Sequence, residues 1–303
     1  LARPRLPARR ARGPQPRDPL GSSPEASPGL CSKRPRECER VPLLASPSGN
    51  SSPMLLNPLD PTFLFLASSF VSVLFIDADA EAMTLTMRLP SAGDVLQYVS
   101  DPAVGVGLAE LCVFLYLTRG SAALSRSRSL AMHWHLWNGV IIYTVMDGCA
   151  GGFGFVPRLS RFYGILDRRY RRDLVGTPAG PSVYEVAVAR TVNATELFVY
   201  TWLSLAAAVG VATRATWHRT IEAAVLAMAA YGSLLFMAPD MLDGCLNQQP
   251  FGVADCFPPV TPFTFFFVYF GVLINWIWLG VPVWMLAVRV RRDVRAQALK
   301  KRA

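Results

Sequence analysis

The chain of 303 residues carries few charged side chains. Only 17% of its residues are Asp, Glu, Lys or Arg, whereas about 25% is usual in a soluble protein. It also lacks a Cys-x-x-Cys pair, a glycine-rich phosphate loop and a Gly-x-Ser-x-Gly nucleophile elbow. Clustered-cysteine metal sites, P-loop nucleotide sites and serine hydrolase sites each need one of these patterns. We therefore expect no metal and no cofactor.

The basic residues that give the formal net charge of +9 lie in the tails and connections rather than in the apolar runs. This arrangement is typical of a membrane protein whose boundaries are anchored by Lys and Arg. A nucleic-acid-binding protein would instead show a basic stripe with interleaved aromatic residues. Such a stripe does not occur outside the N-terminal tail, so we expect no nucleic-acid partner.

The N-terminal tail, residues 1–53, is rich in Arg, Pro and Ser. A segment of this composition cannot bury enough apolar surface to fold. A transit peptide would have a similar composition, and so would an untranslated stretch read as protein. The apolar segment Thr62–Ile76 is short for a spanning helix, which needs about 20 residues; it reads as a signal-like segment or an artefact. We interpret residues 1–90 as a disordered or targeting segment that need not belong to the mature protein. Alternative starts are Met54, Met83 and Met87.

From residue 94 onward, long apolar stretches alternate with polar connections. Each stretch can cross ~30 Å of hydrocarbon as an α-helix, and none alternates with the period of a strand. The five stretches are Val95–Leu117, Leu130–Phe155, Val183–Ala212, Ile221–Ala238 and Phe263–Val288. The predicted fold is all-α: a polytopic membrane bundle of five transmembrane helices over residues 94–295, followed by a basic cytosolic tail, 296–303.

The charges of the connections predict the orientation, because positive charge favours the cytosolic side. Basic residues follow the first, third and fifth stretches: Arg119, Arg126 and Arg128; Arg214, His218 and Arg219; Arg289, Arg291, Arg292, Arg295, Lys300, Lys301 and Arg302. These connections share one side of a five-helix chain, so the C-terminus is predicted to be cytosolic. One connection disagrees. Six arginines follow the second stretch on the predicted lumenal side: Arg158, Arg161, Arg168, Arg169, Arg171 and Arg172.

Two features bear on the compartment. The C-terminal Lys300-Lys301-Arg302-Ala303 resembles the dilysine retrieval signal of endoplasmic-reticulum membrane proteins; an ordinary solvated basic tail is the alternative. Cys245 and Cys256 share the acidic connection after the fourth stretch. They would form a disulfide if that connection faces an oxidising lumen.

Two of the acids inside the apolar stretches are candidates for a functional role. Asp147 lies late in the second and Glu196 early in the third. Ionisable groups in spanning helices are costly and usually functional. Tyr143 lies four residues before Asp147, so the two share one helix face. Asn275 and Trp278 are three residues apart and also share a face. The alternatives are an interhelical hydrogen bond by Asn275, a position of Asp147 at a helix end, and a structural ion pair of Arg190 with an acid.

This pattern resembles the emopamil-binding protein family, the sterol Δ8–Δ7 isomerases, within the EXPERA domain superfamily. The resemblance covers roughly residues 95–290. It rests on the two acids, on Tyr231-Gly232 in the fourth stretch, and on an aromatic run with Phe267 and Tyr269 that precedes Asn275-x-x-Trp278 in the fifth. The family uses a His-x-x-x-Glu pair in helix two, a Glu in helix three, and the Asn and Trp of helix five. The resemblance therefore implies catalytic roles for Tyr143, Asp147, Glu196 and Asn275, and substrate binding by Trp278, Tyr231, Phe267 and Tyr269.

The sequence departs from the family at two of these positions: Tyr143 replaces the His and Asp147 replaces the Glu. Tyrosine is a weak acid, with a reference pKa of about 10. The resemblance implies a cholestenol Δ-isomerase that works through a carbocation in the endoplasmic-reticulum membrane, with a sterol or other lipid as its substrate; a homodimer is compatible with the sequence. A non-catalytic sterol- or lipid-binding protein, like the sigma-2 receptor branch with its two ligand-binding acids, remains an alternative. A small transporter or scaffold is a third.

Overall fold

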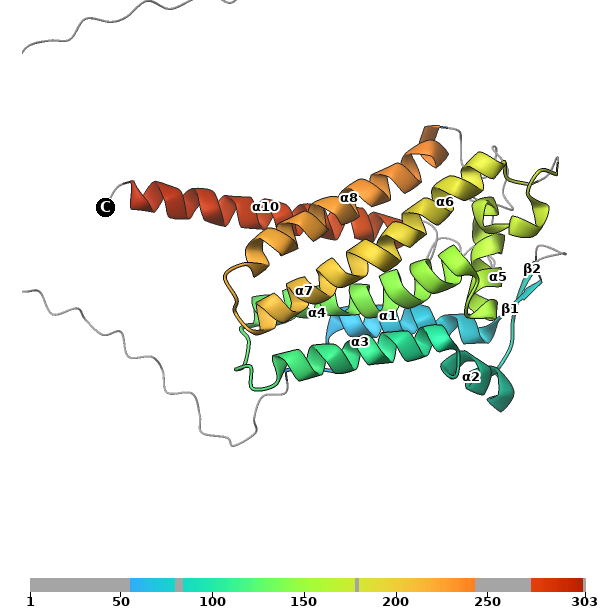
Figure 1. Ribbon diagram of the computed structural model, residues 1–303, viewed down its shortest axis with the longest axis horizontal. Helices are drawn as coiled ribbons and strands as arrows, with labels where there is room; N and C mark the ends of the chain where they lie inside the picture. The colour runs from blue at the N-terminus through green and yellow to red at the C-terminus, as the bar shows by residue number, and fades with distance from the viewer. Residues whose placement is uncertain (1–54, 80–83, 178–179, 243–273, 302–303) are drawn as a thin grey trace, which may run out of the picture. The chain divides into compact units, whose positions relative to one another are not determined.

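The computed structural model describes residues 55–79, 84–177, 180–242 and 274–301, all of which belong to one compact unit, Ser52–Ala303. They are almost entirely helical (Figure 1). The α-helices are α1 (Pro61–Ser72), α2 (Ala92–Val99), α3 (Pro102–Thr118), α4 (Arg126–Trp137), α5 (Pro157–Leu166), α6 (Val183–Thr195), α7 (Thr201–Ala212), α8 (His218–Leu242) and α10 (Ile274–Lys300). Two further helical segments, η2 (Asn138–Phe153) and η5 (Glu196–Tyr200), are π-helical. Short 3₁₀ turns are η1 (Val73–Phe75), η3 (Arg168–Tyr170) and η4 (Arg172–Leu174), and the one described sheet is the hairpin β1 (Ile76–Asp79) and β2 (Thr84–Met87).

The prediction of a helical fold is confirmed, and the apolar helices are consistent with a membrane protein. Two continuous helices are long and apolar enough to cross a membrane, Val183–Ala212 and His218–Ala238. Two bent pairs, α2 with α3 and Arg126–Phe153 with α5, would raise the number of spans to four if each pair crosses once. The described residues thus contain two to four candidate spans rather than five. The fifth predicted stretch begins at Phe263, outside the described residues.

The break in the first stretch follows from Asp101 and Pro102. Asp101 has extended backbone geometry, and its carboxylate accepts a hydrogen bond from the backbone N–H of Ala103. Pro102 occupies the first helical position, where its missing N–H costs nothing. The chain therefore starts a new helix here, and α2 and α3 meet at 55°.

Residues 55–79 and 84–90 are ordered, whereas the sequence pattern predicted a disordered or targeting segment over residues 1–90. Helix α1 packs against α4 and η2, with Leu66 and Ser69 buried. The imidazole Nε2 of His133 accepts the backbone N–H of Asn57 at 3.1 Å, and the Tyr98 hydroxyl donates to the Phe70 carbonyl at 2.8 Å. An apolar helix of 12 residues is too short to span a bilayer. Helix α1 instead buries its apolar side chains against the bundle.

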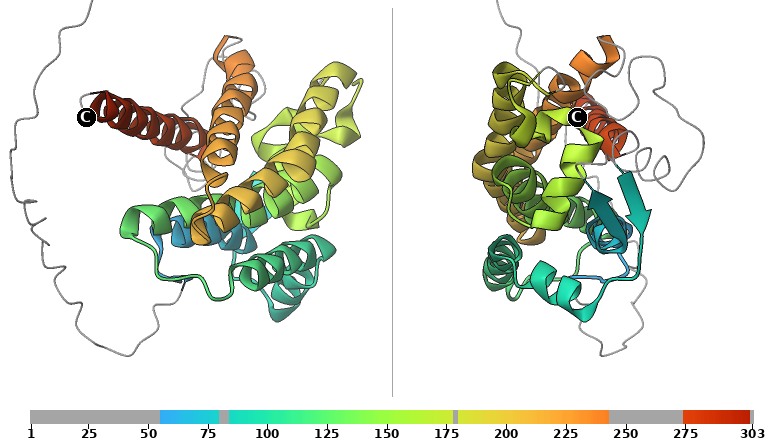
Figure 2. Two further views of the ribbon diagram at one scale, coloured as in Figure 1. Left: turned by 60° about the vertical axis from the view of Figure 1, so that its left-hand side comes forward. Right: turned by 90° about the vertical axis from the view of Figure 1, so that its right-hand side faces the viewer.

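The helices form a layered bundle. Helices α2 and α3 lie on one side and α8 and α10 on the other, with η2 and α7 between them (Figure 2). The α3–α4 and α7–α8 connections and the C-terminal end of α10 lie at the same end of the helices (Figure 1). At that end Arg214 donates to the Ala123 carbonyl at 2.9 Å, and Arg289 pairs with Glu222 at 2.9 Å. The three basic segments that the sequence placed on one side are thus gathered together.

Most of the arginines after the second stretch are neutralised locally. The paired side chains are Arg158 with Asp94 (2.8 Å), Arg168 with Glu185 (2.5 Å), Arg169 with Asp167 (2.5 Å) and Arg171 with Asp173 (2.9 Å). The guanidinium of Arg169 also stacks over the Phe236 ring at 4.0 Å. This connection therefore carries less free positive charge than its sequence suggests.

Gly148 sets how closely the two π-helical segments approach. A Cβ at this position would lie 2.8 Å from Cβ of Leu197 on η5, and Leu197 is the neighbour of Glu196. Small residues at helix contacts let backbones come close in membranes. The absence of a side chain at Gly148 therefore brings the segments that carry Asp147 and Glu196 together.

Replacement of Gly148 by Ala is expected to overpack this contact, and also the contact of the same Cβ with the Tyr143 carbonyl oxygen on η2. The expected loss of stability is about 1–3 kcal/mol. The measurement is thermal unfolding of the purified protein in detergent. Gly105 on α3 provides the control, because a Cβ there meets nothing within 4 Å. If Gly148→Ala and Gly105→Ala melt at the same temperature, Gly148 does not control the approach.

Candidate functional site

The two intramembrane acids lie on the two π-helical segments. Asp147 belongs to η2, and Glu196 is the first residue of η5. The widened turn of η5 is held by Thr201, whose hydroxyl donates to the Glu196 carbonyl at 3.1 Å. π-Helical turns are rare and occur frequently at functional sites.

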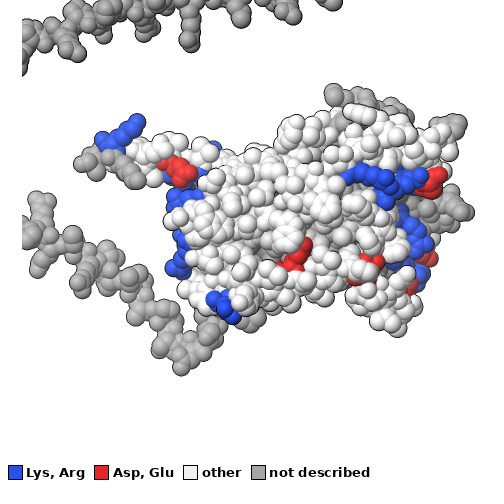
Figure 3. Space-filling model, viewed as in Figure 1, with Lys and Arg blue, Asp and Glu red and all other residues white. Residues whose placement is uncertain are grey.

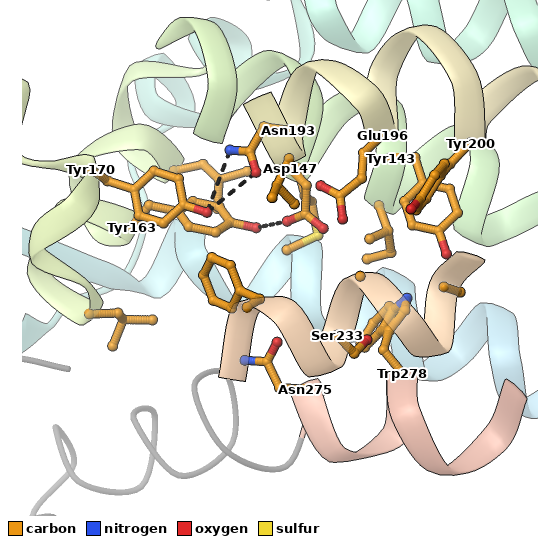
Figure 4. A pocket seen from close by; sticks show the side chains of 18 of the residues that line it. Tyr143, Asp147, Tyr163, Tyr170, Asn193, Glu196, Tyr200, Ser233, Asn275 and Trp278 are labelled. Carbon is orange, nitrogen blue, oxygen red and sulfur yellow. Dashed lines mark hydrogen bonds between the residues drawn. The ribbon is translucent and has the colours of Figure 1, made fainter. Parts of the chain in front are cut away.

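Both acids line one cavity inside the bundle (Figure 4). The cavity has a volume of about 100 Å³ and is partly open to the outside. Its walls come from η2, α5, η3, α6, η5, α8 and α10. Most of the lining is apolar or aromatic, with a few convergent polar groups, as is usual for small-molecule sites.

The surroundings of the two carboxyl groups differ. The Tyr163 hydroxyl donates a short hydrogen bond to Oδ1 of Asp147. The side chain of Glu196 makes no hydrogen bond with any described residue, and its carboxyl group points toward that of Asp147 (Figure 4). Asp147 is therefore held as a hydrogen-bond acceptor. The Glu196 carboxyl group has no such partner and is available to a ligand in the cavity.

Three more of the residues singled out in the sequence line the same cavity: Tyr143, Asn275 and Trp278. Tyr143 is buried, and its ring meets the Tyr200 ring edge-on with centroids 5.6 Å apart. Trp278 is also buried. Its indole N–H lies toward the Tyr143 hydroxyl but makes no hydrogen bond of acceptable geometry within the described residues. The residues that the resemblance assigned to catalysis are thus brought together from helices far apart in the sequence.

The assignment of Tyr231 to substrate binding does not agree with the structure. Its side chain is 61% exposed on the outside of α8, whereas the next two residues, Gly232 and Ser233, line the cavity. Successive residues of an α-helix point about 100° apart, so Tyr231 faces away. Phe267 and Tyr269 lie outside the described residues, as do Cys245 and Cys256.

Several lining residues were not singled out by the sequence: Tyr163, Tyr170, Asn193, Tyr200 and Ser233. Asn193 lies three residues before Glu196, a spacing that predicts a shared helix face. Its amide contacts the Tyr170 hydroxyl at 3.4 Å. Tyr163 and Tyr170 follow Pro157 in the arginine-rich connection, where nothing in the sequence indicated that the chain folds back onto the acids.

A third acid, Glu110, is buried outside the cavity. It is 5% exposed on α3, and the Thr144 hydroxyl lies 2.8 and 3.0 Å from its two oxygens. Thr144 also contacts the Thr201 hydroxyl at 3.2 Å. Glu110 therefore joins α3 to η2 and α7 and provides a buried acid that does not face the cavity.

The alternative of an ion pair between Arg190 and an acid is not observed among the described residues. Glu185 pairs instead with Arg168, and Asp147 accepts from Tyr163. Arg190 is exposed on α6.

No protein-family model matches the chain, and no curated protein matches it. The described residues contain no group of three or more His, Cys, Asp or Glu side chains that could hold a metal ion. The function must therefore be argued from the cavity itself.

Proposed function

We propose that this protein is a five-span endoplasmic-reticulum membrane enzyme that isomerises a Δ8-sterol to a Δ7-sterol, as the emopamil-binding protein family does. The observation that carries the proposal is the meeting of Asp147 and Glu196 in one largely apolar cavity within the helix bundle. Asn275 and Trp278 from α10 line the same cavity. In this proposal α10 completes the fifth span, and the basic C-terminal end faces the cytosol.

The reaction needs two proton transfers at carbon. Moving a ring double bond from C8–C9 to C7–C8 adds a proton at C9, leaves a cation at C8 and removes a proton from C7. Two carboxyl groups in different surroundings can divide the acid and base roles. Glu196, whose side chain makes no hydrogen bond within the described residues, is the proton donor in this scheme. Asp147, already an acceptor from Tyr163, is the carboxylate that stabilises the cation or takes the proton.

The aromatic lining suits a cationic intermediate. The face of an aromatic ring stabilises a cation by ~0.5–2 kcal/mol, and Trp is the best of the rings. Trp278 and Tyr143 both line the cavity beside the acids, so either ring can take this role. The apolar walls supplied by α5 and α8 would keep water away from the reacting ring carbons of a sterol.

Expression of the chain in cells that lack the Δ8–Δ7 isomerase tests the proposal. The expected result is that Δ7-sterols return and Δ8-sterols fall. Continued accumulation of Δ8-sterol, with the protein present at normal levels in the membrane, would overturn it.

A non-catalytic sterol- or lipid-binding role is the second candidate, and Tyr143 favours it. This residue takes the place of the family's histidine, and its hydroxyl is a far weaker proton donor at neutral pH. This candidate predicts that a sterol or a cationic amphiphile raises the melting temperature of the protein while no isomerised product forms.

A further inference from the structure

A second hollow lies on the outside of the bundle, separate from the acid cavity. It has a volume of about 630 Å³ and is open to the surroundings. It follows α6 and η5 and includes the end of η2; its lining residues are Gly152, Phe153, Arg172, Arg190, Thr191, Ala194, Thr195, Phe198 and Val199. It therefore opens on the outer face of the candidate span Val183–Ala212.

Two guanidinium groups stand at one end of this hollow. Arg172 donates to the carbonyls of Gly151 and Gly152 at 2.5 Å, which fixes it at the C-terminal end of η2. Arg190 is exposed and makes no hydrogen bond or ion pair with a described residue. Burial and the nearby positive charge of Arg190 both lower the pKa of Arg172. Both groups line the same hollow.

The nearest carboxylates in the sequence do not balance this charge. Glu185 is paired with Arg168 at 2.5 Å, and Asp173 is paired with Arg171 at 2.9 Å. No Asp or Glu lines the hollow. Figure 3 shows basic side chains gathered over this end of α6, next to uncharged surface toward the middle of the helices.

The other end of the hollow is apolar and aromatic. Phe153 and Phe198 are 49% and 62% exposed, and their rings meet edge-on at 6.1 Å. The hydroxyls of Thr191 and Thr195 donate to carbonyls of their own helix, so they offer little to a polar ligand. Arg190 and Phe198 are eight residues apart, or ~12 Å along the helix axis.

We propose that this hollow binds one anionic phospholipid, with its phosphate on Arg190 and Arg172 and an acyl chain along Phe153 and Phe198. Guanidinium groups match phosphate oxygens in geometry and charge. A free phosphate ion would use the arginines but not the aromatic wall. The proposal needs only that the α6–α7 span is embedded in lipid and does not depend on sterol chemistry.

Native mass spectrometry of the full chain, extracted from phosphatidylcholine bilayers that contain phosphatidylglycerol, tests this site. The wild-type protein is expected to retain one phosphatidylglycerol, and Arg190→Gln to bind it at least about fivefold more weakly. Arg190 is the residue to change because Arg172 also caps η2. Arg161→Gln is the matched control: Arg161 is an exposed arginine of α5 that does not line the hollow.

Two further measurements separate the sources of the anion. Phe198→Asn is expected to weaken retention of phosphatidylglycerol, and millimolar inorganic phosphate is expected not to displace the lipid. Equal retention by wild type and Arg190→Gln would overturn the proposal, and so would equal losses in Arg190→Gln and Arg161→Gln. Displacement by inorganic phosphate, with Phe198→Asn unaffected, would show an anion site rather than a lipid site.

Discussion

Replacement of Glu196 by Gln is expected to lower the turnover of a Δ8-sterol about 10²- to 10⁴-fold, the range that a positioned acid or base contributes. Gln has nearly the same shape but cannot give up a proton to carbon. Because Glu196 makes no side-chain hydrogen bond within the described residues, the change breaks no observed contact and the fold should persist. The measurement is product formation by purified protein, normalised to its folded fraction.

Glu110→Gln is the matched control for this experiment. Glu110 is also a buried acid of the bundle, but it contacts Thr144 rather than the cavity. Gln can still accept the Thr144 hydrogen bond through its amide oxygen. Turnover by Glu110→Gln is expected to stay within a few-fold of wild type. Equal activity of Glu196→Gln and wild type would remove Glu196 from the mechanism.

The double replacement Asp147→Asn with Glu196→Gln is expected to be little worse than either single replacement. Residues that act as one unit in a reaction show strongly non-additive losses, because removal of one already disables the step that both serve. The two carboxyl groups share one cavity and point toward each other, so we expect a single large loss of about 10²- to 10⁴-fold in all three variants.

The same two single variants and the double variant can also be compared in ligand binding. Affinity for a cationic amine, which mimics the charge of the intermediate, is measured in wild type, both single variants and the double variant. If the losses in turnover simply multiply, the two acids work independently and the shared acid–base scheme does not hold. If turnover is absent in wild type while amine binding depends on both acids, the non-catalytic candidate is the correct one.

Much of the helical architecture could be predicted from composition and run length. The boundaries of the third and fourth stretches, Val183–Ala212 and Ile221–Ala238, coincide closely with the two continuous candidate spans. The bends between helices could not be predicted equally well. Asp101-Pro102 was visible as an interruption, but whether a capped restart makes one bent span or two helices depends on packing, which local sequence does not specify.

The acids of the site could be predicted because an ionisable residue in an apolar run is unusual whatever the fold. Tyr163 and Tyr170 could not, because they reach the cavity only after the chain turns by 72° between η2 and α5. The π-helical form of η2 and η5 could not be predicted either, because the hydrophobic patterns of α- and π-turns differ too little over a short segment. Tyr231 shows the reverse error: a residue named from a motif sits one position away from those that face the cavity.

The sequence does not distinguish Glu110 as a buried structural acid, for a different reason. It lies in the first stretch, Val95–Leu117, between the apolar residues Ala109 and Leu111. The partner that makes it tolerable, Thr144, is 34 residues away on η2. Long-range pairings of this kind determine which buried acids are structural and which face a cavity, and a single sequence does not reveal them.

The central claim is tested most directly by incubating the purified full chain with a Δ8-sterol in deuterated water and analysing the product. The account predicts a Δ7-sterol that carries one deuterium at C9, with the signal lost in Glu196→Gln and retained in Glu110→Gln. Recovery of unchanged Δ8-sterol by a folded protein, or a Δ7-sterol without solvent deuterium, would contradict it.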